Sequence, residues 1–174
     1  MEPSESANSG AARQGEGQAF DHAHEHMRQL DPVQALENGD RYARMGKWSQ
    51  ALGLYHEAIG SLTKSTAPTL VAQVRVAASI AQRKLGSMRS ALRHADLAVT
   101  ACAADACAHA ARGAALEALG LVVDAHAAFV QAARLEPSQP THAEAAARLL
   151  PLRCLLAGTG AENSNGQLAP VAAA

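Results

Sequence analysis

The sequence predicts an all-α fold, a solenoid of three antiparallel helix hairpins followed by a C-terminal capping helix. A glycine follows a run of helix-forming residues at Gly46, Gly86 and Gly120, with separations of 40 and 34 residues. Alanines lie five and twelve residues after each of these glycines, and a small residue lies seven before. These small residues are Ala51, Ala58, Ala91, Ala98, Ala125, Ala132, Gly39, Ser79 and Gly113. A helix-turn-helix unit of about 34 residues is typical of helical solenoids.

The composition predicts one domain with a modest core. A chain of 174 residues falls in the size range of single domains. Hydrophobic residues make up 48% of it but aromatic residues only 3%, so the interior must be built from alanine, leucine and valine. The net charge is -1 and the 15 lysines and arginines are dispersed, which argues against a nucleic-acid partner.

Cysteine usage and the terminal composition predict a cytoplasmic protein with no membrane partner. The three cysteines are an odd number without metal-ligand spacing, and no hydrophobic leader precedes them, so reduced thiols are expected. Acidic residues in the first twenty positions argue against an organelle transit peptide. No apolar run approaches the roughly 18 residues that cross a bilayer.

The first repeat, about residues 32–67, should begin after a polar tail. Residues 1–30 are predicted to be flexible, although a short helix can form from Phe20 to Leu30. Asp31 is placed to cap a helix over residues 32–45, with Pro32 at its first position. After the glycine turn, helical spacing resumes over residues 48–62.

Two further hairpins and a cap follow. The stretch SLTKSTAP is an insertion in the loop that precedes the second repeat, whose range is about 68–104 with helices over 68–85 and 88–101. The third repeat, 105–138, pairs helices over 105–119 and 122–135. A last helix over about 141–150 is read as a cap, residues 139–156, and Pro151 either kinks or ends it. The predicted domain is therefore 31–156, with a flexible tail over 157–174.

These residues resemble the tetratricopeptide repeat (TPR) family. The first repeat agrees with the family pattern at Gly39, Tyr42, Gly46, Ala51, Tyr55 and Ala58. The third repeat agrees at Gly113, Gly120, Ala125, Phe129, Ala132 and the LEP ending at Pro137. The second repeat departs from the pattern at Gln82, Ala95 and Ala103. The resemblance implies a right-handed solenoid whose concave face, lined by the first helix of each repeat, binds segments of partner proteins.

The register of the repeats predicts which residues line that face. The groove residues expected to contact a partner are Leu36, Glu37, Asp40, Arg44, Gln73, Val76, Ala77, Ile80, Arg83, Lys84, Ala110, Ala114 and Glu117, and Val33, Cys107 and Ala111 share their register. The predicted surface is apolar with charges at its margins. An adaptor that binds an apolar or amphipathic segment of another protein is therefore expected. The alternatives are closure of the groove by the protein's own tail and self-association.

The layout is also similar to co-chaperone domains that hold the acidic tail of heat-shock chaperones. Those domains grip the terminal carboxylate with lysine, asparagine and arginine at five positions. Here the five positions hold Leu36, Asp40, Ala77, Cys107 and Ala111, and Arg112 is turned about 100° away from the groove. The sequence therefore predicts that this clamp is absent, which leaves chaperone binding by a non-clamp mode as an alternative.

The sequence predicts neither an enzyme nor a cofactor or metal site. The only cluster with ligand chemistry contains His22, His24 and His26, and it is interpreted as a solvated polar stretch, with a metal-binding regulatory tail as the alternative. Cys102 and Cys107 are interpreted as packing residues rather than a redox pair. No glycine-rich phosphate loop or catalytic triad spacing is present.

Overall fold

The computed structural model describes residues 31–159, and this part of the chain is built from α-helices without strands. The helices are α2 (Pro32–Arg44), α3 (Trp48–Gly60), α4 (Pro68–Lys84), α5 (Met88–Ala101), α6 (Ala106–Ala118), α7 (Val122–Leu135) and α8 (Pro140–Thr159). The predicted N-terminal tail lies outside the described residues, together with the short helix from Phe20 to Leu30 and the cluster of His22, His24 and His26. The predicted C-terminal tail, 157–174, lies outside them from residue 160 on.

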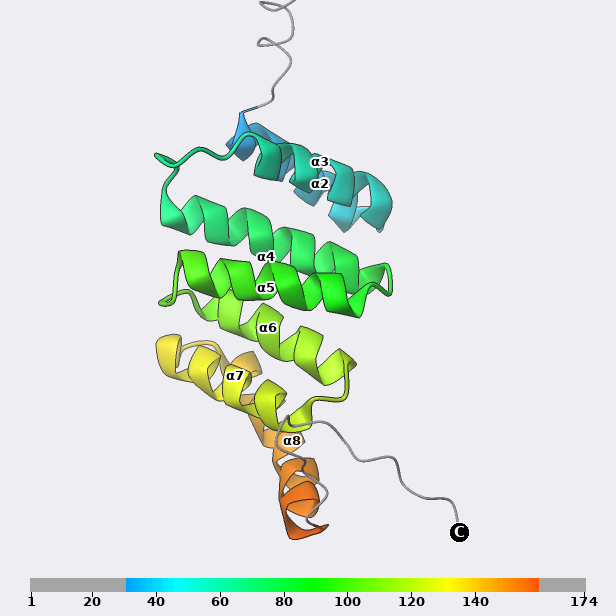
Figure 1. The fold of residues 1–174 in the computed structure, drawn as a ribbon, viewed down its shortest axis with the longest axis vertical. Coiled ribbons are helices and arrows are strands. Elements are labelled where there is room, and N and C mark those ends of the chain that lie inside the picture. The colour runs from blue at the N-terminus through cyan, green and yellow to red at the C-terminus, as the bar shows by residue number, and fades with distance from the viewer. Residues whose placement is uncertain (1–30, 160–174) are drawn as a thin grey trace, which may run out of the picture.

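Successive helices form a stack of antiparallel hairpins. Helix α2 pairs with α3, α4 with α5 and α6 with α7, and the hairpins follow one another along the long axis of the molecule (Figure 1). Helix α8 packs against α7 at the end of the stack. The predicted all-α solenoid is confirmed.

The recurring glycines close the first helix of each hairpin. Gly46, Gly86 and Gly120 have φ angles of 73°, 82° and 78°, a left-handed conformation in which other residues are strained. At the first turn, Gly46 donates its N–H to the Ala43 carbonyl and Lys47 donates to the Tyr42 carbonyl, both at 2.9 Å. The same pair of bonds recurs at the other two glycines. Each turn is therefore a Schellman motif, which satisfies carbonyl groups that the helix end would leave unpaired.

Capping residues or prolines mark the starts of α2, α4 and α6, and Asp31 and Pro32 were predicted as such. Asp31 accepts a long 3.5 Å hydrogen bond from the Val33 N–H, and Pro32 occupies the first position of α2. Asp105 accepts a 2.9 Å bond from the Cys107 N–H at the start of α6. Pro68 begins α4. These residues satisfy or remove backbone donors that the first helical turn cannot pair internally.

In the first and in the third hairpin, an aromatic ring of the second helix packs against a glycine of the first helix. Tyr55 of α3 lies against Gly39 of α2, where an added Cβ would come within 2.7 Å of the ring carbon Cδ1 and closer still to Cε1. Phe129 of α7 lies against Gly113 of α6, where an added Cβ would meet three ring carbons at 3.0 Å. A side chain at position 39 would have to displace the Tyr55 ring, and one at position 113 would crowd the Phe129 ring. Both positions therefore favour glycine for packing.

The second hairpin uses small residues in place of the ring and the glycine. Ser79 of α4 corresponds to the glycines, and Ala95 of α5 corresponds to the rings. Both are buried, and the Ser79 hydroxyl donates a 2.8 Å hydrogen bond to the Ala91 carbonyl. Because a buried hydroxyl without a partner is destabilising, this bond explains how serine is accommodated there.

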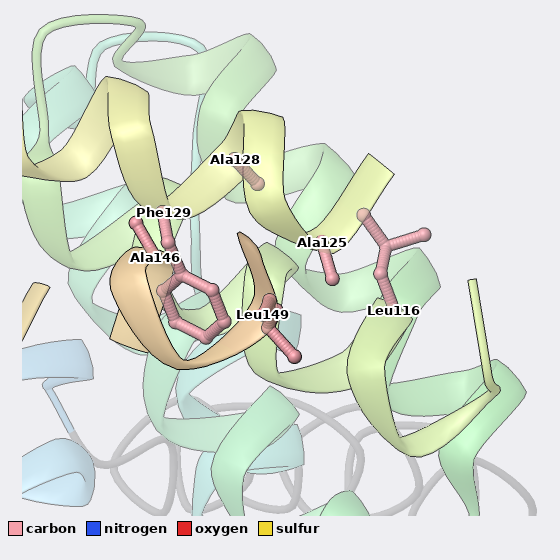
Figure 2. Close-up of a cluster of buried hydrophobic side chains, with 6 residues drawn as sticks. All are labelled: Leu116, Ala125, Ala128, Phe129, Ala146 and Leu149. Carbon is pink, nitrogen blue, oxygen red and sulfur yellow. The ribbon is translucent and has the colours of Figure 1, made fainter. Parts of the chain in front are cut away.

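Helix α8 covers the last hairpin and is longer than predicted. Its buried residues Ala146 and Leu149 pack with Leu116 of α6 and Phe129 of α7 in one apolar cluster (Figure 2). The helix continues through Pro151 to Thr159 instead of ending near Leu150. After the cluster it extends beyond the stack (Figure 1). Proline is tolerated there in an exposed turn, although it cannot donate the backbone hydrogen bond to the fourth residue before it.

Gly39→Ala and Gly53→Ala should change stability in opposite directions. An alanine at position 39 must displace the Tyr55 ring, so we expect it to lower the free energy of unfolding by about 1–3 kcal/mol. Gly53 lies within α3 with no heavy atom within 4 Å of an added Cβ. Alanine should therefore stabilise that helix by about 0.5–1 kcal/mol. Denaturant unfolding monitored by circular dichroism measures both, and shifts in the same direction would contradict this packing.

Candidate functional site

A cavity of ≈ 1030 Å³ lies over the first two hairpins and reaches the start of the third. We call it the α2–α4 cavity. Helix α2 supplies Leu36, Asp40, Ala43 and Arg44; α3 supplies Trp48 and Tyr55; α4 supplies Thr69, Gln73, Val76, Ala77 and Ile80; and the segment around the start of α6 supplies Cys102, Ala104, Asp105 and Cys107. Most of these side chains are apolar, so the cavity offers an apolar surface with a few charges.

Seven of the groove residues expected from the sequence line this cavity. They are Leu36, Asp40, Arg44, Gln73, Val76, Ala77 and Ile80. Those that lie elsewhere are Glu37, Arg83, Lys84, Ala110, Ala114 and Glu117. The cavity therefore brings together the expected residues of the first two hairpins, and from the third it includes only the start of α6.

The expected residues at the end of α6 contact α8. Glu117 accepts a 2.9 Å hydrogen bond and ion pair from Arg148 of α8. Ala114 packs against the apolar cluster that includes Ala146 and Leu149. These contacts engage part of the third hairpin with the last helix. Lys84 lies at the end of α4, with its Nζ 5.8 Å from the centre of the Trp48 ring.

A tyrosine orients the carboxylate in the cavity. The Tyr55 hydroxyl donates a 2.8 Å hydrogen bond to Oδ1 of Asp40. Tyr55 is only 2% exposed, so its ring fixes the position of that donor. Burial, followed by the interaction with Asp40, raises the pKa of the Tyr55 hydroxyl above its usual value. The phenol therefore stays protonated at neutral pH and continues to donate.

The arrangement of the cavity does not favour nucleophilic or metal chemistry. Partial desolvation and, to a lesser extent, Asp105 and Glu136 raise the pKa of the Cys107 thiol, which lowers its thiolate fraction. Within residues 31–159, no group of three or more histidine, cysteine or acidic side chains is placed to hold a metal ion. Cys107 is exposed rather than packed, whereas Cys102 packs beside a buried alanine cluster.

Comparisons with solved structures identify the fold. The first TPR of Spaghetti (RPAP3), bound to the HSP90 peptide SRMEEVD, is 21% identical, and the match covers 72% of this chain and 95% of that one with a TM-score of 0.64. The Arabidopsis OM64 TPR domain is 26% identical, with 69% and 94% covered and a TM-score of 0.61. This chain has the TPR fold. The Sgt2 TPR domain from Aspergillus fumigatus is also similar, at 18% identity with 82% and 91% covered and a TM-score of 0.62.

The resemblance read from the sequence is thus confirmed by TPR structures. No protein-family model matches the sequence, and no curated protein matches it either. None of the helices between residues 31 and 159 combines the length and the apolar character needed to cross a bilayer.

The five positions that the resemblance assigns to a carboxylate clamp carry no cation in this chain. Four of them, Leu36, Asp40, Ala77 and Cys107, line the α2–α4 cavity. The fifth, Ala111, is buried, with 8% of its surface exposed. Arg112 does not line the cavity, and its Nε donates a 2.8 Å hydrogen bond to Asp96 of α5. The cavity therefore coincides with four clamp positions but presents a carboxylate there.

Sequence reasoning missed several residues of the cavity. Trp48 and Tyr55 of α3 border the cavity, although only the first helix of each repeat was expected to line the groove. Thr69, Ala43, Ala104 and Asp105 were not expected there. The loop before α6 enters the site because the cavity runs across the helices, whereas register within single helices identifies only positions along each one.

A second titratable cluster joins three helices away from the α2–α4 cavity. The rings of His56 of α3 and His94 of α5 are stacked, with centroids 5.9 Å apart. Arg75 of α4 places Nη1 3.5 Å from Nδ1 of His94. Burial, followed by the nearby charge of Arg75, lowers the pKa of His94 to about 4. His94 is therefore neutral in the folded protein at neutral pH.

Stability should fall as the pH drops from 6.5 to about 4. Over this range the unfolded chain takes up a proton at His94, because the ordinary pKa is 6.5, while the folded chain does not. Thermal unfolding followed by circular dichroism should show a smaller fall in Tm for His94→Gln than for the wild type. The control His126→Gln, outside this cluster, should keep the wild-type dependence. An unchanged pH dependence in His94→Gln would contradict the assignment.

Proposed function

We propose that this TPR protein is a non-enzymatic adaptor that binds an apolar or amphipathic segment of a partner protein in the α2–α4 cavity. The observation that carries the proposal is the cavity itself, whose volume of ≈ 1030 Å³ is at the upper end of ligand sites. It is lined mainly by apolar and aromatic side chains, including Trp48, Val76 and Ile80. Such surfaces bind helices and extended segments through apolar anchors.

Several observations support a binding role rather than catalysis. The thiol of Cys107 has a raised pKa, which disfavours its nucleophilic form. The Asp40 carboxylate accepts its hydrogen bond from the Tyr55 hydroxyl and not from a histidine. The three cysteines are free, which fits a reducing compartment such as the cytoplasm. The similar TPR structures include domains bound to the HSP90 peptide SRMEEVD and the HSP70 peptide SGPTIEEVD.

A segment of a partner is a better occupant than an acidic chaperone tail. A desolvated terminal carboxylate needs charge-assisted donors to replace water. Leu36, Ala77 and Cys107 provide no cation at these positions in the cavity, and the fourth position holds the acidic residue Asp40. We therefore propose that the carboxylate clamp does not operate here.

The peptide SRMEEVD should not bind by a clamp. Fluorescence anisotropy with the labelled peptide should show no saturation up to about 100 µM protein. A TPR domain that binds this peptide serves as the positive control. Tight binding would contradict the proposed absence of a clamp if it is lost when Asp40 or Ala77 is changed to a bulky residue. Tight binding that survives those changes would favour chaperone binding by another mode.

Filling the cavity should abolish partner binding. Gln73 is exposed on α4 and lines the α2–α4 cavity, so Gln73→Trp occupies it with little effect on the core. Peptides selected on the wild type from a random dodecapeptide display library should bind Gln73→Trp at least about tenfold more weakly by anisotropy.

The matched control is Gln131→Trp, which changes an exposed glutamine of α7 that does not line the cavity. It should bind the selected peptides like the wild type. Recovery of no binding peptide, or equal binding by Gln73→Trp, would contradict the proposed function. Circular dichroism of both variants excludes unfolding as the cause of any loss.

A further inference from the structure

The α2–α4 cavity has an excess of negative charge where related clamps are positive. Its charged lining residues at neutral pH are Asp40, Asp105 and Arg44. Within residues 31–159, no ion pair joins Arg44 to either carboxylate. Arg44 is exposed at the end of α2, where its long side chain can extend into water. The lining therefore carries two carboxylates and one guanidinium, and neither carboxylate is ion-paired with that guanidinium.

Asp40 is held ready to accept another hydrogen bond. Its Oδ1 accepts from Tyr55 at 2.8 Å, and the buried phenol ring is fixed against Gly39. A carboxylate has about four acceptor sites, so this bond leaves acceptor capacity, including that of Oδ2. The fixed Tyr55 hydroxyl restricts the orientation of the Asp40 carboxylate before a partner binds. A cation would then pair with it at a smaller entropic cost.

Asp105 is less available than Asp40. Its Oδ1 accepts from the Cys107 N–H at 2.9 Å and caps α6. The positive end of the helix dipole also offsets part of its charge. Asp40 lies within α2, away from such an end, and is half-buried among apolar neighbours of the cavity. Of the two carboxylates, that of Asp40 therefore attracts a cation more strongly.

We propose that the α2–α4 cavity selects apolar peptide segments that carry a lysine or arginine, with the cation paired to Asp40 of this chain. This inference rests on the proposed function and specifies its partner. Apolar residues of the segment contact Val76, Ala77 and Ile80, and the basic side chain reaches the oriented carboxylate. The charge preference is opposite to that of a clamp for acidic tails, because a second carboxylate beside Asp40 would be repelled.

The experiment is a selection followed by a double-mutant cycle. Peptides from a random dodecapeptide display library are selected on the full-length wild-type protein, and those that Gln73→Trp fails to bind are kept. These cavity-directed peptides should be enriched in lysine or arginine. Replacing the basic residue of a selected peptide with methionine should weaken its binding to the wild type by at least about tenfold, measured by fluorescence anisotropy.

The cycle assigns that loss to Asp40. Asp40→Asn keeps the shape and an oxygen that can accept from Tyr55, so the fold is preserved while the charge is removed. The lysine and methionine peptides should then bind Asp40→Asn within about twofold of each other. Asp124→Asn, an exposed aspartate of α7 outside the cavity, should retain the full wild-type difference.

The outcomes separate the two proposals. If no selected peptide depends on the cavity, the proposed function fails and this inference fails with it. If cavity-directed peptides lack basic residues, or if the methionine substitution costs the same with Asp40→Asn as with the wild type, partner binding stands but the charge preference is overturned. Enrichment of acidic peptides would overturn the preference most directly.

Discussion

The contact of the Tyr55 ring with Gly39 is the constraint on which the first hairpin and the cavity both depend. Because Gly39 has no Cβ, the ring lies directly against α2 and joins it to α3. The same ring carries the hydroxyl that holds Asp40 at the cavity. One side chain thus links helix packing to the orientation of a charge in the site, so changes in the packing should be transmitted to binding.

The three hairpins solve the same packing problem with different residues. Rings against glycines join the helices at both ends of the stack, whereas the middle hairpin uses Ala95 and a hydrogen bond from Ser79. This exchange conserves the backbone arrangement while it reduces the aromatic content of the core. Helix α4 of that middle hairpin supplies five residues to the cavity, more than any other single helix.

Much of the fold could be predicted from local sequence, because turns and close contacts place narrow demands on residue type. The turns at Gly46, Gly86 and Gly120 could be predicted, because glycine readily adopts the positive φ that these turns require. Register within helices also predicted that Leu36 and Ile80 share a surface with Asp40. The hydrogen bond from Tyr55 to Asp40, the entry of Asp105 into the cavity and the pairing of Glu117 with Arg148 could not be predicted, because they depend on how separate helices lie in space.

The affinity of Tyr55→Phe for a cavity-directed basic peptide tests the central claim most directly, because phenylalanine keeps the ring on Gly39 and removes only the donor to Asp40. Isothermal titration calorimetry should show binding weakened by roughly two- to tenfold, the loss expected when one hydrogen bond no longer orients the carboxylate. The circular dichroism spectrum should remain that of the wild type. Unchanged affinity in this folded variant would contradict the link between ring packing and recognition of the partner.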